Sequence, residues 1–577
     1  MPTNEKIIIY QLLPRLFGNR TQHCVHNGTI DQNGCGKMND INAKALKSLK
    51  ALGVTHVWYT GIIEHANKTD YSSYHIKPCN PHVVKGNAGS PYAIIDYYDI
   101  DPDIAEDVER RQDEFDRLVV RTHEAGMGVI IDFVPNHVAR EYHSDAKPAG
   151  VADLGSDDNP YQAFARDNNF YYLPGQPFAP HVDMGQGEER YVENPARATG
   201  NDCFYASPGV NDWYETVKLN YGIDYCGGTG CHFKPIPSTW HKMLDILKYW
   251  TSRGVDAFRC DMAHMVPVEF WKWAIAQIKA IAPHVFFIAE LYDTSLYHRF
   301  VNEGGFDYLY NKVTLYDTLF AVTRHHAPAS DITRCWQSLP DLDDHMLNFL
   351  ENHDEVRLAS PQFAGDAFRG LPAMVVSATM SRAPFMLYMG QELGEPALDA
   401  EGFSGPDGRT TIFDYWAIDT LRRWNHNGAF NTSLLSNSEK TLRDYYKKIL
   451  TLCNKETALA QGDFFDLMYV NGDTLDTCRQ YAFMRHTRGV LLIIAVNFDD
   501  KPVKTSIRIP QHAFDLYDIR PGVMSARELT TGVSESRTLS PERSFDIDLK
   551  PFGACVWKMR FVTRSSSMNK RKKKSED

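Results

Sequence analysis

The stretch VDAFRCDMA, residues 255–263, is a short apolar strand whose end carries charged side chains. Arg259 and Asp261 stand two positions apart, and alternate side chains of a strand leave the same face, so both point in one direction. Seven further short apolar stretches are separated by amphipathic helical segments; they lie at residues 7–13, 54–63, 128–138, 285–291, 306–311, 346–354 and 384–392. Eight strands that alternate with helices predict an α/β fold whose parallel sheet closes into a (β/α)8 TIM barrel.

The helical pattern is clear in three places. In residues 113–126 the apolar positions fall on one helix face, and Gly126 stands where a helix-ending glycine is expected. Residues 438–456 have a similar helical pattern, and we also expect a helix over residues 410–425.

The spacing of the strands also predicts the domains. Asp132 and Asp261 are 129 positions apart, whereas a βα unit of a barrel takes roughly 30 residues. We therefore predict that a loop-rich subdomain follows the third strand. The predicted divisions are a barrel at 1–132 and 240–457, an inserted domain at 133–239, a C-terminal antiparallel β-sandwich at 458–562 and a disordered basic tail at 563–577.

The composition argues against several classes of partner. A net charge of −12 gives no field that would attract nucleic acid or an anionic membrane, and we find no apolar run long enough for a membrane span. The first residues lack the pattern of a secretory signal, and eleven cysteines are an odd number without framework spacing. We expect a cytoplasmic protein, or a periplasmic or secreted one if a leader was trimmed. The oligomeric state is left open.

Polar residues recur at the ends of four predicted strands. In a barrel the carboxyl ends of the strands form the floor of the active site. A single acidic residue at such a place is more often a salt-bridge or capping group, but recurrence at four strand ends favours one shared pocket. The residues are Asp132, His137, Arg259, Asp261, Glu290, His353 and Asp354.

Two of these carboxyl groups suggest a reaction. The neighbouring Arg259 guanidinium should lower the pKa of Asp261 and keep it an anion, as a nucleophile requires. Glu290 ends an apolar run beside a second carboxylate and could stay protonated as an acid. Cleavage of a glycosidic bond with retention needs such a pair, with the two carboxyl groups about 5 to 5.5 Å apart.

Four motifs, in this order, are together highly specific: DFVPNHV at 132–138, FRCDMA at 258–263, FFIAEL at 286–291 and FLENHD at 349–354. With them the chain resembles the α-amylase superfamily, glycoside hydrolase family 13, from about Ile7 to Trp557. The resemblance implies a catalytic nucleophile at Asp261, an acid/base at Glu290 and a transition-state-stabilising residue at Asp354. It also implies substrate-binding or supporting roles for Tyr92, Asp132, His137, Arg259 and His353.

Three departures from the family pattern concern metals and product length. Many α-amylases bind calcium through an asparagine equivalent to Asn136 and an aspartate, but here Lys218 stands at the aspartate's position and its ammonium could replace the cation. In DQNGCGKMND, residues 31–40, Cys35 and Lys37 replace the ligands of a second calcium loop. We therefore expect no metal and no cofactor. His264 takes the place of a family lysine on the leaving-group side, which leaves product length open.

The leading hypothesis is hydrolysis of α-1,4-glucans such as starch or maltodextrins by double displacement. Transfer of the glucosyl unit to another sugar, as in a glucanotransferase or isomerase, would use the same residues. A catalytically silent sugar-binding member is the alternative from another class, but such members usually lack one of the three carboxylates that this chain retains.

Overall fold

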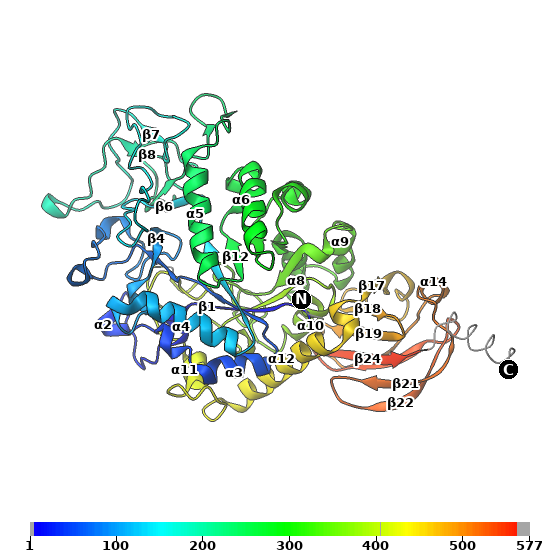
Figure 1. Cartoon of the computed structure of the whole chain (residues 1–577). Coiled ribbons are helices and arrows are strands. Elements are labelled where there is room, and N and C mark those ends of the chain that lie inside the picture. Colours follow the sequence, from blue (N-terminus) through cyan, green and yellow to red (C-terminus); the bar gives the residue numbers. More distant parts are fainter. Residues whose placement is uncertain (1–4, 404, 562–577) are drawn as a thin grey trace.

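The computed structural model describes residues 5–403 and 405–561 of the chain. Eight parallel strands close into a barrel in the order β1, β16, β15, β14, β13, β12, β5, β2, as the sequence predicted (Figure 1). Each predicted apolar stretch contributes one strand. The strands are β1 (Ile8–Leu12), β2 (His56–Tyr59), β5 (Gly128–Phe133), β12 (Ala257–Cys260), β13 (Phe286–Ala289), β14 (Tyr308–Tyr310), β15 (Met346–Phe349) and β16 (Phe385–Tyr388).

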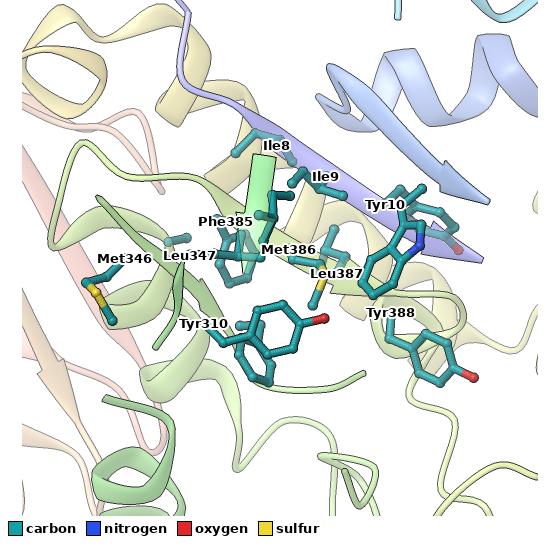
Figure 2. Packing of buried hydrophobic residues seen from close by; sticks show 14 of the residues in the cluster. Ile8, Ile9, Tyr10, Tyr310, Met346, Leu347, Phe385, Met386, Leu387 and Tyr388 are labelled. Carbon is teal, nitrogen blue, oxygen red and sulfur yellow. The ribbon is translucent and has the colours of Figure 1, made fainter. Parts of the chain in front are cut away.

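Buried side chains pack on both faces of the barrel strands. Strands β1 and β16 pair in parallel with Ile8 opposite Phe385 and Tyr10 opposite Leu387. Figure 2 shows these four residues near Tyr310 of β14, and all five are fully buried. The Tyr10 hydroxyl donates to Glu392, whereas the next residue, Gln11, donates to Thr60 and lies 2.8 Å from His353, so Ile8 and Tyr10 lie on the face of β1 opposite Gln11. Both faces of β1 are therefore buried, as expected of a parallel sheet that helices cover.

Helices cover the outside of the barrel (Figure 1). The main ones are α3 (Ala43–Leu52), α4 (Arg111–Glu124), α5 (Ser238–Ser252), α6 (Val268–Ile281), α8 (Asp317–Thr323), α9 (Ile332–Gln337), α10 (Leu371–Thr379), α11 (Asp419–Asn425) and α12 (Asn437–Lys455). Helix α4 buries Phe115, Leu118, Val119 and Thr122, the face that the sequence predicted. Gly126 follows with a φ of 74°, a backbone conformation that favours glycine.

Of the two helices predicted near the end of the barrel sequence, one forms at its predicted place and the other is shorter than predicted. Helix α12 forms as expected and begins with a capping box between Ser436 and Glu439. The helix expected over residues 410–425 was too long, because only α11 is helical. Thr411 donates to Asp414 over 2.8 Å and accepts from the backbone of Phe413, and such local side-chain bonds compete with helix formation.

Two hairpin-rich regions lie beside the catalytic end of the barrel. One is the antiparallel pair β3 (Ile63–His65) and β4 (Ile94–Ile100). The other lies between β5 and α5 and holds only short pairs in a loop-rich chain: β6 (His137–Ala139) with β9 (Thr216–Lys218), β7 (Tyr172–Leu173) with β8 (Ala196–Arg197), and β10 (Ile223–Asp224) with β11 (Gly230–Cys231). The β6–β9 pairing sets His137 opposite Lys218.

A C-terminal antiparallel β domain packs beside the barrel, away from the inserted region (Figure 1). Its six-stranded sheet has the order β17, β18, β19, β24, β21, β22, and a two-stranded sheet pairs β20 with β23. The strands are β17 (Asp463–Asp466), β18 (Gln480–Thr487), β19 (Val490–Asn497), β20 (Val503–Ile507), β21 (Gly522–Glu528), β22 (Ser534–Leu539), β23 (Phe545–Leu549) and β24 (Ala554–Arg560). The predicted antiparallel domain is confirmed.

Three other expectations concern the chain as a whole. Among the described residues, none of the helices has both the length and the apolar character needed to cross a bilayer. All eleven cysteines are free thiols, and Cys226 and Cys231 are exposed. The tail predicted to be disordered, residues 563–577, lies outside the described residues.

Candidate active site

One buried arginine organises the carboxyl ends of β5, β12 and β13. The Arg259 side chain is fully buried. Its Nη1 lies 2.8 Å from Oδ1 of Asp261 and 3.4 Å from Oδ1 of Asp132, and its Nη2 lies 2.8 Å from Oε2 of Glu290. A single guanidinium therefore contacts three carboxyl groups, and the two predicted to react are held by its two terminal nitrogens.

A cavity of about 300 Å³ opens above this cluster. Six of the residues predicted from the sequence line it: Tyr92, His137, Asp261, Glu290, His353 and Asp354. Asp132 and Arg259 lie beneath the cavity and bind its lining residues. The strand-end residues therefore converge on one place, as a barrel active site requires.

The two oxygens of Asp261 have different surroundings. Oδ1 accepts a hydrogen bond from Arg259, while Oδ2 is buried and has no hydrogen-bond partner among the described residues. Burial raises the pKa of Asp261 well above its usual range, the neighbouring Glu290 raises it further, and Arg259 only partly opposes them. The expectation of a lowered pKa at Asp261 was therefore wrong, because burial and the neighbouring Glu290 outweigh the guanidinium.

Glu290 is held by two hydrogen-bond donors and one ion pair. Its Oε1 accepts from the Tyr292 hydroxyl over 2.7 Å, and its Oε2 accepts from the backbone N–H of Met262 over 2.8 Å besides its contact with Arg259. Met262 has a φ of 43°, an uncommon conformation for a residue with a side chain. The turn after β12 is thus shaped so that its backbone binds Glu290.

Asp354 stands at the opening of the cavity, and its side chain is 39% exposed. Nε2 of His353 lies 2.9 Å from its Oδ2, and Nδ1 of the same ring lies 2.8 Å from Nε2 of Gln11. Because the Gln11 amide donates to Nδ1, a neutral His353 carries its proton on Nε2 and donates it to Asp354. Burial alone would raise the pKa of Asp354, but His353 and more distant arginines hold it below the usual value.

Tyr92 and Asp132 build the wall next to His353. The rings of Tyr92 and His353 stack with centroids 5.1 Å apart. The Tyr92 hydroxyl donates to Asp132 over 3.3 Å, and Nε1 of Trp58 donates to the other Asp132 oxygen over 2.9 Å. Asp132 therefore positions an aromatic face without lining the cavity itself.

His137 and His264, the remaining predicted residues, differ in their relation to the cavity. Burial, and then the nearby Lys218 ammonium, lower the pKa of His137 to about 3, so its ring is neutral at neutral pH. His264 does not line the cavity, and its ring centroid lies 6.4 Å from that of Tyr292. Its Nδ1 is buried without a partner among the described residues, and its role on the leaving-group side stays a prediction.

The cavity also contains residues that the sequence analysis did not single out. Nζ of Lys85 lies 3.0 Å from Oε2 of Glu215, and the ring of Trp213 lies 5.1 Å from that of His137. These three come from irregular loops, where no periodicity marks them. Tyr292 could have been found, because it stands two positions after Glu290.

The Lys218 ammonium lies against Asn136, as we expected from the sequence. Its Nζ donates to Oδ1 of Asn136 over 2.7 Å and lies 2.5 Å from Oδ1 of Asp202. In the N-terminal loop, Nζ of Lys37 donates to the backbone oxygen of Asp103 over 2.6 Å. An ammonium thus contacts the oxygen that the family resemblance assigned to calcium, and the absence of calcium at that place stays a prediction.

Comparison with known sequences gives consistent matches. The family model described as "Alpha amylase, catalytic domain" matches residues 11–425. "Alpha-amylase 3" of Dictyoglomus thermophilum is 24% identical over 488 residues, which are 80% of this chain and 79% of that protein. An α-1,4-glucan:maltose-1-phosphate maltosyltransferase of Rhodospirillum rubrum is 26% identical over 308 residues, 52% of this chain but only 39% of that protein.

Solved structures match along nearly the whole chain. An α-amylase from Geobacillus thermoleovorans, solved with acarbose, has a TM-score of 0.62 at 18% identity and covers 98% of this chain and 100% of its own. A maltogenic α-amylase from Thermotoga neapolitana has a TM-score of 0.61 at 17% identity and covers 96% of this chain and 99% of its own. At such identities the likeness concerns the fold.

Proposed function

This chain belongs to the α-amylase family of glycoside hydrolases and related transferases, and we propose that it is a retaining hydrolase of α-1,4-glucosidic bonds in starch, maltodextrins or related α-glucans. The observation that carries the proposal is the Arg259 guanidinium, which contacts both Asp261 and Glu290 at 2.8 Å on the floor of one cavity. Two carboxyl groups held this close suit double displacement, in which one attacks and the other transfers a proton.

In the first step Oδ2 of Asp261 attacks the anomeric carbon of the sugar. That oxygen has no competing hydrogen bond among the described residues, while Oδ1 is fixed by Arg259. The bond from the anomeric carbon to the glycosidic oxygen breaks, and Glu290 gives its proton to the departing oxygen. A sugar ester of Asp261 and a Glu290 carboxylate result.

In the second step a water molecule attacks the same carbon from the side that the leaving group vacated. Glu290, now a carboxylate, takes the proton of this water, and the ester bond to Asp261 breaks. Both enzyme groups return to their starting states. Two inversions at one carbon leave the product with the configuration of the substrate.

Other side chains of the cavity would hold the sugar while this happens. Asp354 is ionised at neutral pH because its pKa is lowered, and it stands at the opening where it can accept bonds from ring hydroxyls. The Tyr92 ring offers a flat face, which suits the apolar face of a pyranose. The neutral His137 can donate one hydrogen bond and accept another.

Transfer is the second candidate, since maltosyltransferases are among the sequences that match. The same ester of Asp261 would then react with a sugar hydroxyl in place of water. The access of an acceptor sugar to the ester decides between the two outcomes, and that access depends on loop residues such as Lys85, Trp213 and Glu215 at the cavity.

Incubation with maltoheptaose, followed by chromatography of the products, tests the proposal. We expect shorter maltooligosaccharides, whereas products longer than the substrate would assign transfer. The Glu290→Gln variant is the matched control and should lose nearly all turnover while still binding the sugar. If wild-type protein binds maltoheptaose without any turnover, the chain is a sugar-binding member, and if Glu290→Gln stays fully active, the acid/base assignment is wrong.

A further inference from the structure

A second cluster of buried acidic residues lies at the β3–β4 hairpin. Glu64 on β3 pairs in register with Asp96 on β4, and Asp99 follows on the same strand. Glu64 is 4% exposed, and the other two are fully buried. One carboxylate oxygen from each residue lies within 4.8 Å of the other two, so the three carboxyl groups face a common point.

The two aspartates of this cluster have partners in the protein. Asp96 accepts hydrogen bonds from Oγ of Ser144 over 2.6 Å and from the backbone of Ala146 over 3.0 Å. Asp99 is ion-paired with Arg111 and accepts from Nε2 of Gln112 over 2.7 Å. The backbone N–H groups of Tyr98 and Ile100 also donate to Asp96 and Asp99. These contacts hold the two aspartates in place with one oxygen of each within 4.8 Å of the Glu64 carboxylate.

Glu64 differs because it has no such partner. Among the described residues, no donor forms a hydrogen bond with its carboxylate and no cation forms an ion pair with it, because Arg111 pairs with Asp99. Burial raises the pKa of Glu64 well above its usual range, and Asp99 and Asp96 raise it further. A buried carboxylate aimed at two others without a donor costs free energy unless a positive charge or a proton joins it.

The charge and spacing of the cluster fit a metal ion. When all three carboxyl groups are ionised, they and the single Arg111 guanidinium leave two negative charges, which one divalent cation would neutralise. Calcium binds oxygen at about 2.3–2.6 Å, so oxygens within 4.8 Å of one another can all contact one ion. The ligands are all carboxylate oxygens, with no histidine or cysteine, which favours a hard cation over zinc or copper.

We propose that Glu64, Asp96 and Asp99 bind one hard divalent cation, of the calcium or magnesium class, at a site separate from the catalytic cavity. The ion would join three parts of the chain. Asp96 already holds the inserted region at Ser144 and Ala146, Asp99 holds the start of α4 through Arg111, and Glu64 adds β3. Tyr92 stands two residues before β4, so a bound ion would also steady the wall of the catalytic cavity.

The test is calcium and magnesium binding by the full chain after treatment with a chelator. Calorimetric titration should give one ion per chain for wild type, with a rise in melting temperature. The variant Glu64→Gln keeps the side-chain shape but removes the charge, and we expect its dissociation constant to rise at least about tenfold and its thermal shift to disappear. The shorter Glu64→Asp, which keeps the charge, should bind with intermediate affinity.

Glu106→Gln is the matched control, because Glu106 is an exposed acidic residue that follows β4 and accepts from Asn39 of the N-terminal polar loop. It should bind the ion as wild type does. Binding of magnesium in place of calcium would assign the smaller ion to the site. The proposal is overturned if wild type binds neither ion, if Glu64→Gln binds as tightly as wild type, or if Glu106→Gln alone removes binding. Since the readout is binding, failure of the proposed hydrolase activity would not affect it.

Discussion

Two clusters of this protein each gather three buried carboxyl groups around one arginine. At the catalytic end Arg259 contacts Asp132, Asp261 and Glu290. At the β3–β4 hairpin, Arg111 forms an ion pair only with Asp99. Both clusters contain three carboxyl groups and one guanidinium. They nevertheless form different sites, because the position of the guanidinium decides which carboxyl groups are paired.

The comparison shows how a buried arginine can serve catalysis. Arg259 holds the reacting carboxyl groups next to each other and leaves one oxygen of Asp261 free beside a cavity. In the hairpin cluster the guanidinium pairs with Asp99, and Glu64 forms no ion pair among the described residues. The first arrangement suits attack on a neutral sugar, and the second suits capture of a cation.

The largest contrast should appear when one aspartate of each cluster loses its charge. Asp261→Asn removes the nucleophile, so kcat on maltoheptaose should fall by about 10⁴-fold or more. Asp99→Asn, the equivalent change in the hairpin cluster, should largely retain activity per folded molecule. Steady-state kinetics of both purified variants would measure kcat. Similar losses of kcat in the two variants would contradict the assignment of catalysis to the Arg259 cluster alone.

Loss of each arginine sharpens the comparison in terms of stability. Arg259→Met leaves three buried carboxyl groups without their shared cation and should lower the free energy of unfolding by about 3–5 kcal/mol. Arg111→Met should cost less, because its side chain is 14% exposed and Asp99 keeps its bond from Gln112. Urea unfolding at neutral pH compares the two, and a greater loss with Arg111→Met would contradict the assignment.

A buried lysine offers a third, smaller contrast. Lys218→Met leaves Oδ1 of Asn136 without its donor and should lower the free energy of unfolding by about 1–3 kcal/mol. Lys248→Met removes a 43% exposed ammonium and should have little effect. Added calcium should raise the melting temperature of Lys218→Met no more than it raises that of wild type, whereas a specific rescue would show that the Asn136 position takes calcium.

The smallest expected effect concerns pH. Asp261 must be ionised to attack, and burial together with the charge of Glu290 raises its pKa. Activity should therefore be lost on acidification at a higher pH than an ordinary carboxyl group would give. Glu290→Gln removes the neighbouring carboxyl group that can become charged beside Asp261, so the pKa of Asp261 should fall and this acid limb should move to lower pH.

The pH shift can be read with an aryl α-glucoside whose leaving group needs no protonation. Such a substrate lets kcat/KM of Glu290→Gln be followed across the acidic range. An acid limb that stays in place, or that moves to higher pH, would show that the two carboxyl groups do not influence each other.

The barrel and most of its site could be predicted from the sequence because both depend on local patterns. Short apolar stretches that end in polar residues fixed the eight strands, and Asp261, Glu290 and Asp354 stand at the ends of three of them. The features that the sequence did not predict depend on tertiary structure. The sign of the pKa shift at Asp261 depends on burial and on the shared guanidinium.

Most of the cavity residues that the sequence did not predict lie in loops. Lys85 and Glu215 meet at the cavity although 130 positions separate them, and no periodic pattern predicts that contact. The same reason hid the hairpin cluster, because Glu64 and Asp96 become neighbours only when β3 and β4 pair. The overlong helix predicted before α11 shows the converse, since side-chain bonds at Thr411 and Asp414 override a helical pattern.

The most direct test of the central claim is to trap the covalent sugar in the Glu290→Gln variant. A glucosyl or maltosyl fluoride carries its own leaving group, so Asp261 can still be glycosylated while the activation of water is lost. Mass spectrometry of the digested protein should then find one sugar adduct on the peptide that contains Asp261. An adduct on a different residue, or rapid turnover of the fluoride without any adduct, would contradict the roles of the two carboxyl groups.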